Sequence, residues 1–186
     1  MTKYASGSGT VVTYAWMWKS AKHALTNAQS SQEGQFFEAM NVLAFSAFAM
    51  EAFLNHAGAK VFEDWIKRER RLSKFKKLEK LTKFLHISPN FKTRPYCSVI
   101  DAFTFRDTIA HGRTEKNEFA TAINPSITDP AYFAESEWMS MCTLGTAQRI
   151  FADIEEVIQK LFASAELGTN AFLHFYSSSY SIESDE

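Results

Sequence analysis

The chain has 186 residues, of which 46% are hydrophobic and 22% charged, and its formal net charge is −1. This length suits one domain with a real core, and the composition is that of a soluble globular protein. The two cysteines, Cys97 and Cys142, show no C-x-x-C spacing, so neither a disulfide framework nor a zinc site is expected. Composition alone therefore favours one domain in a reducing cytoplasm.

Membrane and export signals are not apparent in the sequence. No apolar run approaches the roughly 20 residues that a bilayer-spanning helix needs. The opening MTKYASGSGTVVTY lacks the basic and long apolar regions of a signal peptide. We expect a cytoplasmic protein with a single domain over residues 1–168, of which 1–10 form a flexible lead-in, and a polar acidic tail over 169–186.

The first half of the domain predicts two long helices. A helix over 11–30 is indicated by apolar residues at steps of 4, 3, 4 and 3, namely Tyr14, Trp18, Ala21, Leu25 and Ala28. A second helix over 33–57 is apolar almost all round, which is typical of the most buried element of a bundle.

The second half continues the helical pattern. A third helical region is expected over 60–85, with a break near Ser73. Its basic residues are expected to face outward, and the residues expected to face the core are Phe75, Leu78, Leu81 and Leu85. A fourth helix is expected over 95–111 and is ended by Gly112. The last helix is expected over 130–166, with Asp129 as its N-cap and Pro130 in its first turn. The prediction is an all-α fold, an antiparallel bundle of four to five helices.

Charge is segregated along this chain. Residues 67–83, KRERRLSKFKKLEKLTK, hold nine basic and two acidic side chains, a local charge of +7, while the remaining 169 residues carry −8. Two interpretations stay open: a solvated helix face that aids solubility, or a strip that binds a polyanion such as RNA. The candidate RNA-binding residues are Arg70, Arg71, Lys74, Lys76 and Lys77.

Polar residues enter the apolar second helix on one stripe, formed by Asn41, Phe48, Glu51 and Asn55. Because buried polar groups need partners, we expect Glu51 to meet a cation or an N–H group from another helix. Whether Glu51 is a satisfied core carboxylate or acts directly in catalysis stays open.

The common catalytic signatures are missing from the sequence. It contains no H-E-x-x-H, no Walker-type glycine loop, no G-x-S-x-G and no G-x-G-x-x-G. The five histidines are scattered without metal-ligand spacing. We therefore expect neither a metal nor a cofactor.

The stretch FRDTIAHGR combines Arg106, the polar Asp107, a four-residue spacer and His111 at the end of a predicted bundle helix. It resembles the R-x4-6-H motif of the HEPN superfamily of all-α bundles, in its RN-x-x-AHG form, with Asp107 where asparagine is frequent. The segment FAMEAFLNH is similar to the E-A-F-x-N segment of many bacterial members, which supplies Glu51 and Asn55 as supporting residues.

The HEPN resemblance implies a metal-independent endoribonuclease, toxin-like or defence-related, that works as a homodimer beside a nucleotidyltransferase-like antitoxin partner. Arg106 would grip the scissile phosphate and stabilise its developing charge. His111 would move the proton from the ribose 2′-OH or to the leaving oxygen, with Asp107 as the third catalytic residue. Attack by the 2′-OH leaves a 2′,3′-cyclic phosphate and spares DNA.

Helix geometry limits how Arg106 and His111 can meet. Residues five apart are about 140° apart around a regular helix, so both reach one point only if the helix ends or distorts between them. The alternative is an ion pair of Arg106 with Glu51 or Asp107 and a capping role for His111. A non-catalytic, HEPN-like dimeric module that binds RNA, a nucleotide or a partner protein is therefore the second hypothesis.

Overall fold

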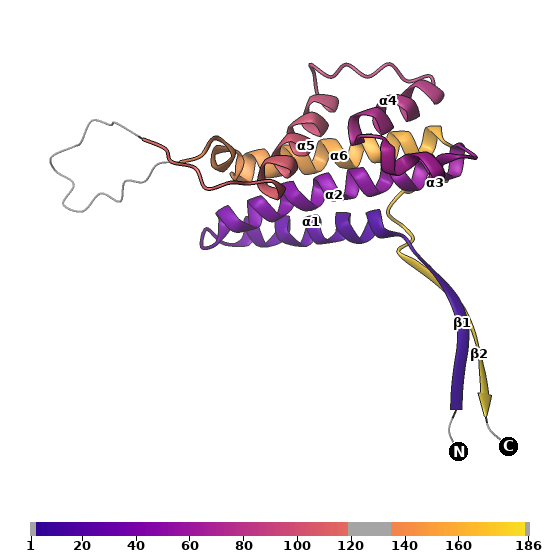
Figure 1. Ribbon diagram of the computed structural model, residues 1–186. Coiled ribbons are helices and arrows are strands. Elements are labelled where there is room, and N and C mark those ends of the chain that lie inside the picture. The colour runs from indigo at the N-terminus through magenta and orange to yellow at the C-terminus, as the bar shows by residue number, and fades with distance from the viewer. Residues whose placement is uncertain (1–2, 119–134, 185–186) are drawn as a thin grey trace.

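The computed structural model describes residues 3–118 and 135–184. Four long helices form an elongated bundle (Figure 1), and they are α1 (Thr13–Ser30), α2 (Gln35–Val61), α5 (Tyr96–Ala110) and α6 (Leu144–Ser164). A shorter helix, α4 (Lys74–Phe84), also packs on α2. The chain is mostly helical, as predicted, and the helices expected over 11–30, 33–57 and 95–111 are confirmed to within four residues at each end.

Helix α2 is the centre of the bundle and contacts α1, α4, α5 and α6. Its residues are apolar on nearly every side, so it can bury surface against all four neighbours. Its largest fully buried side chains are Leu43, Met50, Phe53 and Leu54. As predicted, the second helix runs through the middle of the fold, and it has more buried residues, eleven, than any other helix in the described chain.

By length and composition alone, α2 also passes a test for a membrane-spanning helix. This corrects the expectation that no apolar run approaches that length. Half of its most apolar window is buried inside the bundle, and a single helix of this kind is weak evidence for a membrane span. The cytoplasmic location stays a prediction.

The third helical region divides into three pieces: α3 (Trp65–Arg68), a 3₁₀ turn η1 (Glu69–Arg71) and α4. The predicted break near Ser73 is confirmed, because Ser73 is the N-cap of α4 and its hydroxyl accepts a hydrogen bond from the Lys76 N–H at 3.3 Å. In α2, Gly58 leaves room for the buried indole of Trp65, since a Cβ at Gly58 would lie 2.1 Å from that ring.

The last helix begins later than predicted. Residues 135 and 136 are not helical, a 3₁₀ turn η2 (Glu137–Met141) follows, and α6 begins at Leu144. Thr143 is its N-cap and accepts a hydrogen bond from the Thr146 N–H at 3.2 Å. The proposed cap at Asp129 and Pro130 lies outside the described residues.

The lead-in and the tail are not free ends. They form two strands, β1 (Lys3–Val11) and β2 (Tyr176–Ser184), which pair antiparallel in a register running from Lys3 with Ser184 to Val11 with Tyr176. This ribbon extends away from the bundle (Figure 1). The segments expected to be a flexible lead-in and a polar acidic tail thus contain paired strands, and the all-α prediction lacked this small sheet.

Candidate functional site

Arg106 on α5 is held by two carboxylates from different helices. Its Nη2 lies 3.3 Å from Oε2 of Glu51 on α2, and its Nη1 donates to Oδ1 of Asp107 at 3.0 Å. The guanidinium also lies over the ring of Phe48, 5.4 Å from the centroid. About a quarter of the Arg106 side chain is exposed, at 26%. Glu51 therefore has the cationic partner from another helix that its position on α2 predicted.

Asp107 has a second cation on its other oxygen. The ammonium of Lys74, from α4, contacts Oδ2 of Asp107. Partial burial alone would raise the pKa of Asp107, but the hydrogen bonds from Lys74 and Arg106 outweigh it and hold the pKa below its ordinary value. Asp107 is thus charged at neutral pH and joins α4 to α5.

Lys77 and Asn55 form a neighbouring polar pair, about one helical turn further along α4 and α2 than Lys74 and Glu51. The Lys77 side chain is buried, at 6% exposure, and its ammonium donates to Oδ1 of Asn55 on α2 at 2.7 Å. The resulting group, which we call the α2–α4–α5 cluster, has three cations, two carboxylates and one amide. Its members are Glu51, Asn55, Lys74, Lys77, Arg106 and Asp107.

The positions of Lys74 and Lys77 correct the expectation that every basic residue of this region faces outward. Steps of three and four place 74, 77, 78 and 81 on one face of α4, and Leu78 and Leu81 on that face are buried. The lysine stems lie along the apolar surface while their ammonium groups reach polar partners. The spacing of residues 74, 77, 78 and 81 already indicated this inner face. Lysine side chains are usually exposed, however, so the residue type favoured an outward position. Phe75, expected inside, is 39% exposed.

The imidazole of His111 makes no hydrogen bond or ion pair with the α2–α4–α5 cluster in the part of the chain that the structure describes. His111 is the exposed C-cap of α5, and its backbone N–H donates to the Asp107 carbonyl at 3.0 Å. Helix α5 continues without a break from Arg106 to Ala110 and ends one residue before His111. Within 3–118 and 135–184, no hydrogen bond joins the His111 imidazole to Arg106 or Asp107. The catalytic roles of the three residues stay predictions.

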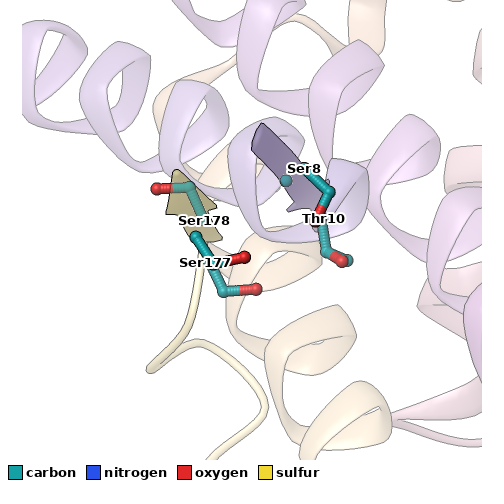
Figure 2. A pocket seen from close by; sticks show the side chains of 6 residues that line it. Ser8, Thr10, Ser177 and Ser178 are labelled. Carbon is teal, nitrogen blue, oxygen red and sulfur yellow. The ribbon is translucent and has the colours of Figure 1, made fainter. Parts of the chain in front are cut away.

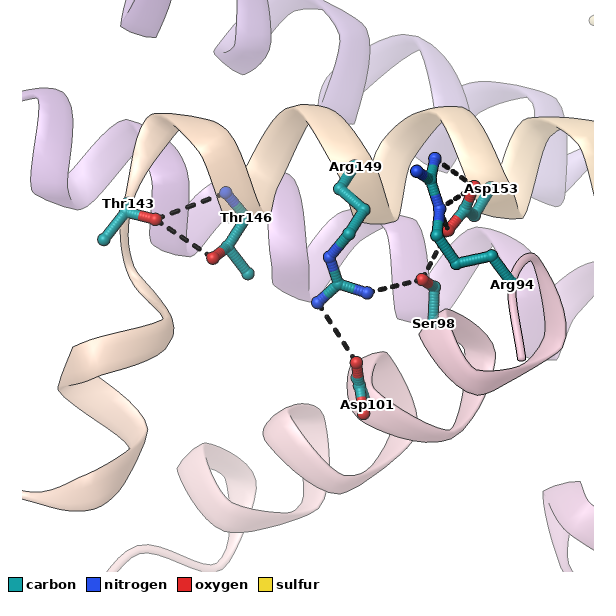
Figure 3. A network of polar contacts seen from close by, with 7 residues as sticks. All are labelled: Arg94, Ser98, Asp101, Thr143, Thr146, Arg149 and Asp153. Atoms are coloured by element: carbon teal, nitrogen blue, oxygen red, sulfur yellow. Dashed lines mark hydrogen bonds and ion pairs between the residues drawn. The ribbon is translucent and has the colours of Figure 1, made fainter. Parts of the chain in front are cut away.

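A second polar network, which the sequence did not indicate, joins α5 to α6 (Figure 3). The buried carboxylate of Asp153 accepts hydrogen bonds from Arg94 Nε at 2.8 Å and from Ser98 Oγ at 2.5 Å. Arg149 then donates to Ser98 Oγ at 2.7 Å and to Asp101 Oδ2 at 3.1 Å. Each charged side chain in this network has a partner on the facing element, so the network stabilises the contact between α5 and α6.

Metal binding finds no support in the part of the chain that the structure describes. There, no three His, Cys, Asp or Glu side chains come together as a metal site would need. The polar groups of the α2–α4–α5 cluster include three cations, which would repel a metal ion.

Comparisons of the chain with protein-family models, with curated proteins and with solved structures gave no match. The HEPN resemblance therefore stays a prediction from the two short motifs around Glu51 and Arg106. The mostly helical fold is broadly compatible with the predicted all-α class.

Proposed function

We propose that the chain is a HEPN-like module that binds RNA without cleaving it, through the exposed cations of residues 67–83. One observation carries this proposal: seven of the nine basic side chains in that segment are exposed, whereas Arg106 is engaged by Glu51 and Asp107. The exposed cations are Lys67, Arg68, Arg70, Arg71, Lys76, Lys80 and Lys83.

Two of the exposed cations have an acidic neighbour. Arg68 pairs with Asp64, and Lys76 pairs with Glu79 at 3.1 Å. Both pairs are well exposed, and such pairs contribute only about 0 to 1 kcal/mol, so a phosphate can replace the carboxylate at little cost. The segment thus offers a polyanion a dense row of hydrated cations, and binding of this kind falls steeply with salt.

The test is fluorescence anisotropy of a labelled single-stranded RNA at several salt concentrations. The variant is Lys76→Glu, Lys80→Glu and Lys83→Glu combined, which leaves the buried Lys74 and Lys77 in place. We expect affinity to fall at least tenfold at low salt, with a flatter dependence on salt.

A matched control changes three exposed lysines elsewhere, Lys19→Glu, Lys22→Glu and Lys116→Glu, and alters the net charge by the same amount. It should lose much less affinity. If both triple variants lose affinity equally, the segment has no special role, and if the unmodified protein does not retain RNA at low salt, the proposal fails.

A second candidate function is the metal-independent endoribonuclease with Arg106, Asp107 and His111 as catalytic residues. The observation that favours it is the partial exposure of Arg106, at 26%, on the same helix that ends at the exposed His111. A phosphate would have to replace Glu51 or Asp107 at the guanidinium, and part-exposed pairs are weak enough to permit it.

The ribonuclease hypothesis predicts cleavage of labelled RNA with EDTA present, 2′,3′-cyclic phosphate ends and no cleavage of DNA. Arg106→Ala and His111→Ala should each abolish it, while Lys116→Ala should not. Cleavage that survives His111→Ala would remove the catalytic assignment. The toxin or defence role and the nucleotidyltransferase-like partner depend on this second candidate alone.

A further inference from the structure

A surface cavity, which we call the α4 cavity, lies where α4 ends and the connection to α5 begins (Figure 1). Its volume is about 480 Å³, within the range of about 300 to 1,000 Å³ in which small-molecule sites usually fall. It adjoins the C-terminal end of the basic segment, residues 67–83. The lining residues that matter here are Glu79, Lys83, His86, Ile87, Pro89 and Phe91.

Backbone hydrogen bonds hold the turn that shapes the α4 cavity. The His86 N–H donates to the Lys83 carbonyl at 3.2 Å. The Ile87 N–H donates to the Thr82 carbonyl at 2.8 Å, which completes a common way of ending a helix. This ending places His86 in the left-handed region, with a φ of 56°, where glycine is favoured because a Cβ is strained there. An imidazole is thus present in the lining although it costs the fold some stability.

The apolar wall of the α4 cavity includes an accessible aromatic ring. Phe91 is 40% exposed, and its ring packs nearly perpendicular to the ring of the buried Tyr96, with 6.0 Å between centroids. Pro89 and Ile87, which are half-buried, complete the wall. Because Tyr96 supports one side of Phe91, the exposed part of the ring is a platform on which a flat base can stack.

The polar side of the α4 cavity carries a cation, an imidazole and a carboxylate. Lys83 and His86 are both exposed, so both can donate hydrogen bonds to a phosphate. The Glu79 carboxylate lies 3.1 Å from the Lys76 ammonium, which offsets its charge, and it can also accept a hydrogen bond from an amino group. A cation beside an aromatic platform is complementary to a nucleotide, which joins a phosphate to a flat base.

A cavity on the ribbon of β1 and β2 has a different chemistry. Its volume is about 330 Å³, and its side chains are serine and threonine hydroxyls, including Ser8, Thr10, Ser177 and Ser178 (Figure 2). Among the described residues that line it, none is charged or aromatic. Volume alone therefore does not indicate a nucleotide site, and it is the lining of the α4 cavity that does.

We propose that the α4 cavity holds one unstacked nucleotide of a single-stranded RNA, with its base on Phe91 and its phosphate at Lys83 and His86. This inference rests on the proposed function, because the rest of the strand follows the exposed cations of residues 67–83. In a duplex the bases are paired and stacked, so phosphates and 2′-hydroxyls are what a protein mainly reaches. The α4 cavity therefore favours single strands, which cations alone would not do.

Fluorescence anisotropy with a labelled single strand of about 12 nucleotides, and with a duplex of the same sequence, tests the proposal. Phe91→Ala should raise the dissociation constant of the single strand by about fivefold or more, the effect of losing one base stack, and leave that of the duplex unchanged. The salt dependence should stay the same, since no charge is removed. Phe91→Tyr should retain the affinity. Lys83→Ala should instead weaken both RNAs and flatten the salt dependence.

The matched control for Phe91 is Phe84. Phe84 is 49% exposed, packs on Phe62 with 5.0 Å between ring centroids, and is not among the residues that line the α4 cavity. Phe84→Ala should therefore leave the affinity for both RNAs unchanged.

Glycine at two left-handed positions separates stability from binding. His86→Gly should raise the melting temperature by a few degrees, since the strain is relieved, and should weaken the single strand alone. Glu166 is the control, because it also has a φ of 56° and ends α6 with the same pair of hydrogen bonds, 3.1 Å to the Ala163 carbonyl and 3.2 Å from Leu167 to Phe162. Glu166→Gly should raise the melting temperature without changing RNA binding.

The outcomes distinguish this inference from the proposed function. If the unmodified protein binds the duplex as tightly as the single strand, or if Phe91→Ala and Phe84→Ala act equally, the α4 cavity holds no base, while RNA binding by the cations stands. Displacement of the strand by an equal concentration of free AMP would overturn the inference in favour of a site for mononucleotides. If neither RNA is retained at low salt, both proposals fail.

Discussion

Arg106 on α5 and Glu51 on α2 form an ion pair, with 3.3 Å between Nη2 and Oε2, in which each side chain is about a quarter exposed. This pair connects the two short motifs that carry the HEPN resemblance. It also sets the central question of function, because a guanidinium already neutralised by Glu51 and Asp107 must lose one of them before it can hold a phosphate.

The Arg106–Glu51 pair should contribute measurably to stability. In a double-mutant cycle of Arg106→Gln and Glu51→Gln, we expect a coupling free energy of about 0.5 to 1 kcal/mol, the upper part of the range for part-exposed pairs. Urea unfolding followed by far-ultraviolet circular dichroism measures it. The same cycle on Arg68 and Asp64, at 64% and 46% exposure, should give a smaller coupling. No coupling between Arg106 and Glu51 would mean that the pair does not form in solution.

Neighbouring lysines of α4 should differ sharply in their effect on stability. Lys77→Ala removes the buried ammonium that donates to Asn55 at 2.7 Å, so we expect a loss of about 1 to 3 kcal/mol. Lys76→Ala, which affects only an exposed pair with Glu79, should change stability by less than about 0.5 kcal/mol. Urea unfolding compares the two. Equal losses would contradict the inward position of Lys77.

The helices of the bundle core could be predicted from the sequence because one physical signal dominates there. Apolar residues at steps of three and four mark the buried stripe of α1, and the all-round apolar character of α2 marks its central place. Glu51 was expected to meet a cation or an N–H group from another helix, since a carboxylate on a buried stripe must have a partner. Its partner in the structure, Arg106, belongs to the FRDTIAHGR motif on α5.

The sequence did not predict the structure correctly in two situations. In one, the residue type and the helical spacing indicate opposite sides of a helix, and in the other, the interacting residues are far apart in the chain. Lys74 and Lys77 are on the inner face of α4 by spacing, but lysine is rarely buried, and the partners that make it favourable are on other helices. The ribbon pairs residues more than 160 positions apart without a hairpin turn, and its serines and glycines have low strand propensity. Only the alternation of Tyr176, Tyr180 and Ile182 with serines hinted at β2.

Acid should weaken the α5–α6 junction through Asp153. Burial alone would raise the pKa of Asp153, but hydrogen bonds from Arg94 and Ser98 lower it below its ordinary value. The charged carboxylate therefore stabilises the fold above about pH 4, the ordinary range, and this contribution is lost as pH falls through the lowered pKa. Asp153→Asn should cost about 2 to 3 kcal/mol at pH 7.

The pH dependence provides the check on Asp153. The difference in unfolding free energy between the unmodified protein and Asp153→Asn should be constant from pH 7 to 5 and shrink below pH 4. Asp101→Asn is the control, since the Asp101 side chain is 41% exposed and should matter less. A difference that grows on acidification would show that the pKa of Asp153 is raised in the folded state.

Two helical glycines should respond oppositely to alanine. At Gly58 in α2, a Cβ would lie 2.1 Å from the ring of Trp65, which is only 2% exposed, so the indole must move out of its site. At Gly145 in α6, a Cβ would meet nothing within 4 Å. Gly58→Ala should therefore destabilise by about 1 to 3 kcal/mol, despite the better helix propensity of alanine. Gly145→Ala should stabilise by about 0.5 kcal/mol.

Thermal unfolding and the fluorescence of Trp65 measure both glycine variants. Because the chain has four tryptophans, the signal is assigned by repeating Gly58→Ala in a Trp65→Phe background, where the smaller ring should reduce the loss of stability. If Gly58→Ala is as stable as the unmodified protein, α3 does not pack on α2 through Trp65. The position of the basic segment that follows Trp65 would then need a different anchor on the bundle.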